Sequence, residues 1–97
     1  MAEIAHDQLD IRLHAAQRML ERNISAADVL VVLNSGETIE EYPEDTPFPS
    51  QLTLGWVGRR PVHVVWAKAT NTGRVVIITV YEPDPEEWDN TFRGTRT

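Results

Sequence analysis

Three side chains near the start of the chain have the chemistry and the spacing of an anion-handling site. His14, Arg18 and Arg22 follow one another at four-residue intervals within the run RLHAAQRMLERNIS, and a helix places such residues on one stripe. Imidazole titrates near neutral pH and serves as a general base or acid, and guanidinium groups bind phosphate through planar, permanently charged forks. The stripe therefore predicts one wall of a metal-independent RNA-cleaving site, with Arg18 and Arg22 binding phosphate. The alternative is a solvent-exposed helix face on which Glu21 or Asp10 pairs with the arginines.

A second histidine, His63, lies inside the otherwise apolar run PVHVVW. A polar side chain in such a strand needs a hydrogen-bonding partner. Its cross-strand neighbour depends on the hairpin loop TNTG: a four-residue loop places His63 opposite Val80, and a three-residue loop places it opposite Thr79 or Tyr81. We name His63 and Tyr81 as further candidate catalytic residues. A hydrogen-bonded core histidine and a tyrosine at the rim of a strand are the alternative interpretation.

The elements that must position these residues form one domain, since 97 residues support a single modest core. We expect helices at about 8–22 and 25–35, strands at about 37–42, 51–57, 62–69 and 74–82, and a polar tail at 83–97.

The spacing of apolar residues predicts which side of each helix faces the core. In the first helix, Leu9, Leu13, Ala16 and Leu20 recur at three- and four-residue intervals and predict its buried stripe. The second helix should begin at Ser25, which forms a capping box with the aspartate three residues later.

Two helices followed by a meander of about four strands predict an α+β fold. The helices cover one face of a mainly antiparallel sheet, and the other face is left for a ligand, the tail or another subunit. In the tail, Trp88 and Phe92 lie four residues apart and are suited to anchor it on the body.

Composition narrows the classes of function. The formal net charge is −6, which disfavours nucleic acid, but ten of the fifteen acids lie in residues 37–45 and 82–89, and the rest of the chain is mildly basic. There is no cysteine, which excludes disulfides and thiol chemistry. His6, His14 and His63 lack the spacing of metal ligands, so we expect no metal and no cofactor. Without a membrane-spanning run or a signal peptide, a cytoplasmic protein is expected.

Three runs carry a resemblance to a known family: HAAQRMLERNISAADVLVVLNSGETIEEYP, PSQLTLGWVGRRPVHVVWA and VVIITVYEPDPEEWDNTFRGTR. Together they closely resemble family 4258 of the domains of unknown function. That bacterial family shows a pattern like His-Ala-x-x-Arg-Met-x-x-Arg-x-Ile-Ser, then Pro-x-His-Val, then Ile-Thr-x-Tyr-x-Pro-Asp-x-x-x-Trp. Here Asn23 stands where the family often has glycine.

The resemblance implies a remoter connection to the RelE-like superfamily of small ribonuclease toxins. Such proteins have two N-terminal helices packed on an antiparallel sheet, and many are encoded beside an antitoxin-like protein with a zinc-binding domain, similar to the partner of MqsR-type toxins. The positions that match the family motifs are His14, Arg18, Arg22, His63, Thr79 and Tyr81. Many RelE-like toxins are clearly basic, and this chain is acidic.

The resemblance and the candidate residues together predict a toxin-like, metal-independent endoribonuclease of a bacterial toxin–antitoxin system. Its expected partners are an RNA substrate and an antitoxin with a zinc-binding domain. The alternative is a non-catalytic protein-binding or structural module, in which the histidines hold the core. A homodimer is compatible with both.

Overall fold

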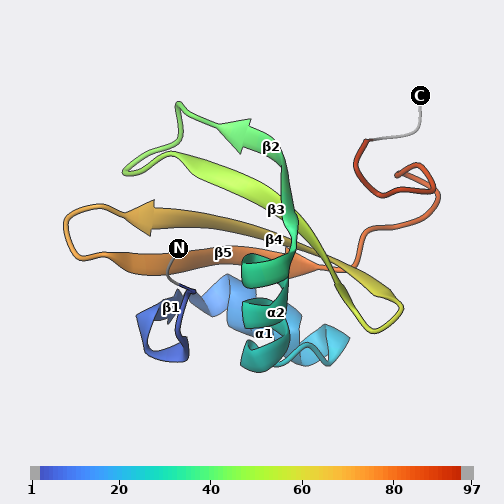
Figure 1. The fold of residues 1–97 in the computed structure, drawn as a ribbon, viewed down its shortest axis with the longest axis horizontal. Helices are drawn as coiled ribbons and strands as arrows, with labels where there is room; N and C mark the ends of the chain where they lie inside the picture. The colour runs from blue at the N-terminus through green and yellow to red at the C-terminus, as the bar shows by residue number, and fades with distance from the viewer. Residues whose placement is uncertain (1–2, 95–97) are drawn as a thin grey trace.

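The structure is a computed structural model that describes residues 3–94. Two helices lie on one side of a five-stranded sheet, below it in Figure 1. The elements in chain order are η1 (His6–Gln8), β1 (Leu9–Ile11), α1 (Leu13–Arg22), α2 (Ala26–Ser35), β2 (Glu37–Tyr42), β3 (Ser50–Val57), β4 (Arg60–Ala69) and β5 (Arg74–Tyr81). The strand order is β1-β5-β4-β3-β2.

The observed sheet differs from the predicted one, although the protein is α+β overall. The prediction of about four strands in a mainly antiparallel sheet is wrong, because β1 adds a fifth strand that runs parallel to β5. Leu9 lies opposite Val75 and Ile11 opposite Ile77. β1 has only three residues, and the position of Leu9 four residues before Leu13 also fits a helix, which is why the predicted first helix began too early.

A bulge in β5 decides which residue faces His63. The loop between β4 and β5 spans residues 70–73, since Ala69 pairs with Arg74. A four-residue loop alone would set His63 opposite Val80, but the register shifts between Val65 and Trp66, and His63 pairs with Tyr81 instead. An extra residue in one strand of an antiparallel pair moves every later pair by one position.

The core-facing side of α1 differs from the predicted stripe. Ala15 and Met19 are buried, whereas Leu13 is 74% and Leu20 is 84% exposed. The prediction counted the stripe from Leu9, which belongs to β1 and not to the helix, so the direction of the helix face was set wrongly.

The second helix packs closely on the sheet. Ser25 and Asp28 form its capping box, as their spacing predicts. Val29 and Val32 are fully buried in the core. A Cβ atom at Gly55 would lie 2.7 Å from the Cα atom of Val32, so only glycine lets α2 approach β3 this closely.

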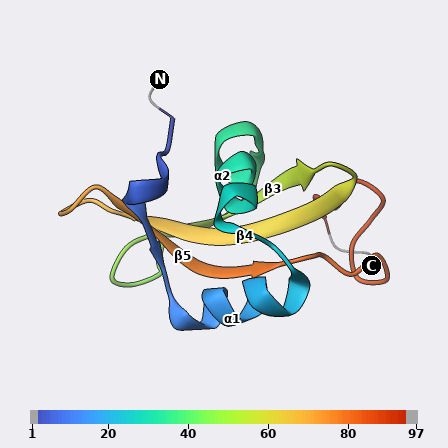
Figure 2. The same cartoon turned by 90° about the horizontal axis from the view of Figure 1, so that it is seen from below.

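The other face of the sheet is covered by irregular chain. Residues 43–49 lie over one end of it, and the tail that follows β5, red in Figures 1 and 2, lies over the other. Within residues 3–94, neither helix is long and apolar enough to cross a membrane.

Candidate functional site

His63 lies in the middle of β4, on the sheet face opposite the helices. Its neighbours Val62 and Val64 point into the helix-side core, and successive side chains of a strand point to opposite faces. His63 has an exposed fraction of 0%. Burial of so polar a group requires that both ring nitrogens have partners.

Both ring nitrogens of His63 are hydrogen-bonded. Nε2 lies 2.9 Å from the main-chain oxygen of Phe92, and Nδ1 lies 3.1 Å from the hydroxyl oxygen of Tyr81. A carbonyl oxygen only accepts, so Nε2 carries the proton and donates it to Phe92. In the neutral ring Nδ1 is then an acceptor, and the Tyr81 hydroxyl donates to it.

The tail covers His63 on the sheet face opposite the helices. The ring of Trp88 meets the imidazole edge to face, with 4.4 Å between centroids, and the ring of Phe92 meets Trp56 at 5.9 Å in the same manner. The prediction that Trp88 and Phe92 anchor the tail on the body is therefore confirmed. Nothing in the sequence predicted that the tail would pack on His63.

Burial sets the protonation of the His63–Tyr81 pair. It lowers the pKa of His63 below its usual value, although the hydrogen bond to Phe92 acts in the opposite direction. Burial also raises the pKa of Tyr81 to about 12, and the nearby Tyr42, Glu40 and Glu87 add to the shift. At neutral pH the imidazole and the phenol are therefore both uncharged. The carboxylates beside them make this end of the sheet face a poor place for phosphate.

His14, Arg18 and Arg22 lie on α1 and are solvent-exposed. The Arg18 guanidinium donates to Glu21 at 3.1 Å, as the solvent-face alternative expects. His14 and Arg18 line a shallow hollow together with Leu20. This hollow is open to solvent.

The structure brings His63 and Tyr81 together and keeps them apart from His14. Since α1 packs on β5 through the helix-side core, its residues and His63 lie on opposite sides of the sheet. Thr79 pairs with Val65, which lies two residues after His63 on β4. Within residues 3–94 the sheet therefore separates the two candidate histidines, and a catalytic site of His14, Arg18, His63 and Tyr81 remains a prediction.

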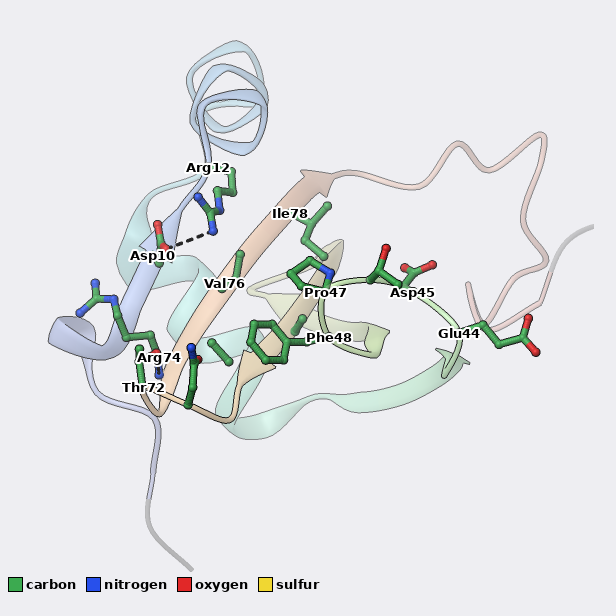
Figure 3. Close-up of a pocket in the computed structure, with 14 residues that line it drawn as sticks. Asp10, Arg12, Glu44, Asp45, Pro47, Phe48, Thr72, Arg74, Val76 and Ile78 are labelled. Carbon is green, nitrogen blue, oxygen red and sulfur yellow. Dashed lines mark hydrogen bonds and ion pairs between the residues drawn. The ribbon is translucent and has the colours of Figure 1, made fainter.

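A second hollow lies at the other end of the same sheet face (Figure 3). It measures about 800 Å³, and Val76 and Ile78 line it together with Pro47 and Phe48 from the loop after β2. Arg12 reaches its rim and forms a long ion pair of 3.5 Å with Asp10. No function was predicted for these residues from the sequence. Among residues 3–94, no group of three or more metal-ligating side chains is close enough to hold a metal ion.

Comparison with known proteins gives one match. A family model described as Domain of unknown function (DUF4258) matches residues 11–82, which span the chain from the end of β1 to the residue after β5. The match therefore ends before the tail that covers His63. Neither the curated proteins nor the solved structures that were compared contain a match to this chain.

Proposed function

Since this chain belongs to the family of the domain of unknown function DUF4258, whose description names no activity, we propose a function from its geometry: it is a protein-binding module. The recognition surface is the exposed face of α1, formed by Leu13, His14, Arg18 and Leu20. The exposure of the two leucines is the observation that carries this proposal.

The exposed leucines lack an explanation in the fold itself. They lie seven residues apart, on one side of α1, while Ala15 and Met19 fill the core. Burial of a leucine side chain stabilises by about 1.5–3 kcal/mol. A partner that covers both leucines therefore gains several kcal/mol without any rearrangement of the sheet.

The charge around the leucines indicates what the partner carries. Residues 12–22 hold three arginines and one glutamate, in a chain whose formal net charge is −6. A partner segment with acidic side chains beside apolar ones complements this face. RNA would complement the arginines but would leave the leucines in water. An antitoxin-like protein, which the family resemblance implies, is the partner that we propose to test first.

The test compares a double leucine variant with the wild type and a matched control. The chain is expressed together with the product of the adjacent gene, and the complex is measured by size-exclusion chromatography and calorimetry. We expect L13S/L20S to lose at least tenfold in affinity, and V31S, a change at a half-exposed valine of α2, to bind normally. Equal binding by all three forms would refute the α1 surface.

A second candidate function, a toxin-like metal-independent endoribonuclease of the RelE-like superfamily, is favoured by one observation. The hydrogen bond between His63 and Tyr81 couples a proton acceptor to a proton donor. This function requires that the tail leave the sheet face, because both nitrogens of His63 are occupied. It also requires cationic groups, and those of α1 lie across the sheet.

Expression of the chain alone, scored for growth arrest and RNA fragmentation, tests the nuclease. If it is active, H63Q should abolish cleavage, and H14A/R18A shows whether the helix residues contribute. The absence of RNA fragmentation in the wild type would remove this candidate and leave the binding module.

A further inference from the structure

The tail contacts Glu37, Trp56 and His63, which lie on one face of the sheet. Glu37, Leu54, His63 and Tyr81 are successive cross-strand partners on β2, β3, β4 and β5. Trp56 lies two residues beyond Leu54 on the same face. We call Glu37, Trp56, His63 and Tyr81 the tail face.

We propose that the tail face is a recognition surface for a peptide segment of a partner protein, and that the chain's own residues 88–93 occupy it in cis. The proposal is independent of the α1 surface, which lies across the sheet.

Each contact between the tail and the tail face is of a kind that recognises a particular group. The imidazole of His63 packs edge to face against the Trp88 ring, and its Nε2 donates a hydrogen bond to the Phe92 carbonyl at 2.9 Å. Trp56 packs edge to face against the Phe92 ring. Glu37 accepts a hydrogen bond from the Arg93 guanidinium. The contacts therefore specify an aromatic residue, a second aromatic residue four positions later, and a basic residue directly after it.

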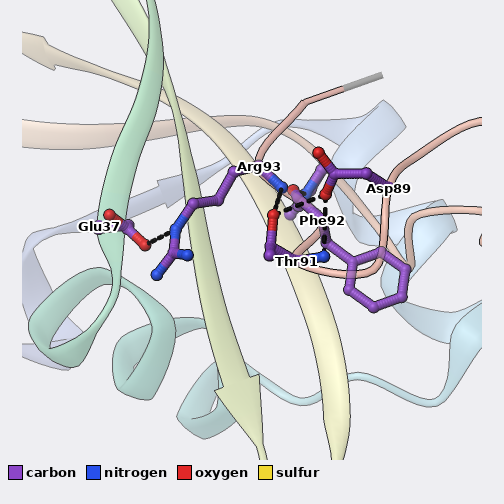
Figure 4. A network of polar contacts seen from close by, with 6 residues as sticks. Glu37, Asp89, Thr91, Phe92 and Arg93 are labelled. Carbon is purple, nitrogen blue, oxygen red and sulfur yellow. Dashed lines mark hydrogen bonds and ion pairs between the residues drawn. The ribbon is translucent and has the colours of Figure 1, made fainter. Parts of the chain in front are cut away.

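Residues 89–93 of the tail form a hydrogen-bonded turn that presents Phe92 and Arg93 to the sheet (Figure 4). The Asp89 carboxylate accepts from the main-chain nitrogen and the hydroxyl of Thr91, and its main-chain oxygen accepts from Phe92. Phe92 has a φ of 59°, which is unusual for an aromatic residue and costs free energy. Its carbonyl thereby reaches His63.

Two observations favour a partner segment over other occupants. The tail face belongs to residues that the family model matches, whereas residues 88–93 lie beyond the match, which ends at residue 82. Of these residues, only Trp88 falls on the family pattern that the chain resembles. Glu37, which forms an ion pair with Arg93, and Glu40 lie on the same strand, and their negative charge disfavours a nucleic acid.

The probe for this surface is a synthetic peptide that spans residues 86–94, EEWDNTFRG. It is added to the full-length wild type, to the full-length release variant W88S/R93E, and to R93E alone. Arg93 is more than half exposed, so R93E keeps the buried contacts and should fold even if the double variant does not. Binding is followed by the NMR signals of the His63 ring.

We expect the peptide to bind the release variant at least tenfold more tightly than the wild type, with R93E between them. The same peptide carrying R93E should bind poorly, and full-length E37R should prefer that charge-reversed peptide over the natural one. A folded release variant or R93E that binds no better than the wild type would overturn the proposal. Equal binding of the natural and the charge-reversed peptide by E37R would also overturn it.

Discussion

The exposed face of α1 and the tail face differ in how burial and residue type are matched. On α1, two leucines are in water and a small alanine is in the core. On the tail face, a histidine is completely buried by a tail rich in charged residues. The buried residues are otherwise mostly apolar, so the contrast teaches that at these positions the covering segment, and not the hydrophobicity of the residue, decides burial.

The largest expected effect comes from the buried histidine. H63A removes a ring that packs against Trp88, and it leaves the Phe92 carbonyl and the Tyr81 hydroxyl without their partner. We expect the free energy of unfolding to fall by about 3 kcal/mol, measured by urea denaturation. H14A is the control, and it should change stability by less than about 0.5 kcal/mol. Similar losses in both variants would contradict the contrast between the two faces.

The next largest effect compares neighbours on α1. Met19 is buried in the core, while Leu20 is among the most exposed apolar residues of the described chain. M19A should therefore cost at least about 2 kcal/mol, and L20A should cost less than about 0.5 kcal/mol. Both are measured by thermal and urea unfolding of the protein without a partner. A reversed order would mean that the leucine stripe predicted from the sequence faces the core after all.

The same contrast explains how far the sequence predicts the structure. The capping box at Ser25 and the anchoring role of Trp88 and Phe92 follow from local chemistry, and the structure has both. β1 was missed because three residues are too few to show a period, and this error misdirected the face of α1. The pairing of His63 with Tyr81 depends on a bulge that leaves no mark in composition.

The candidate site was harder to predict than the fold. Their residue types identify His63 and Tyr81 as candidate site residues, and cross-strand pairing places them side by side. The separation of His14 from His63 follows from which face of the sheet α1 covers. That choice depends on packing across the whole core and not on any motif.

The smallest predicted effect is a pH dependence that belongs to the tail face alone. Burial lowers the pKa of His63 in the folded state, while in the unfolded chain it should be near its usual value of about 6.5. Above that value the ring is neutral in both states and adds no pH dependence. As the pH falls below it, the unfolded chain takes up a proton that the folded state resists, so stability decreases until the pH passes the folded pKa.

The slope from this single proton is at most about 1.4 kcal/mol per pH unit. H63Q is the informative variant, because its amide can donate to Phe92 and accept from Tyr81 without titrating. The difference in unfolding free energy between the wild type and H63Q should therefore shift in favour of H63Q as the pH is lowered from 7 toward 5. A difference that stays constant over that range would mean that the imidazole is protonated as easily in the folded protein as in the unfolded chain, which a ring sealed beneath Trp88 does not permit.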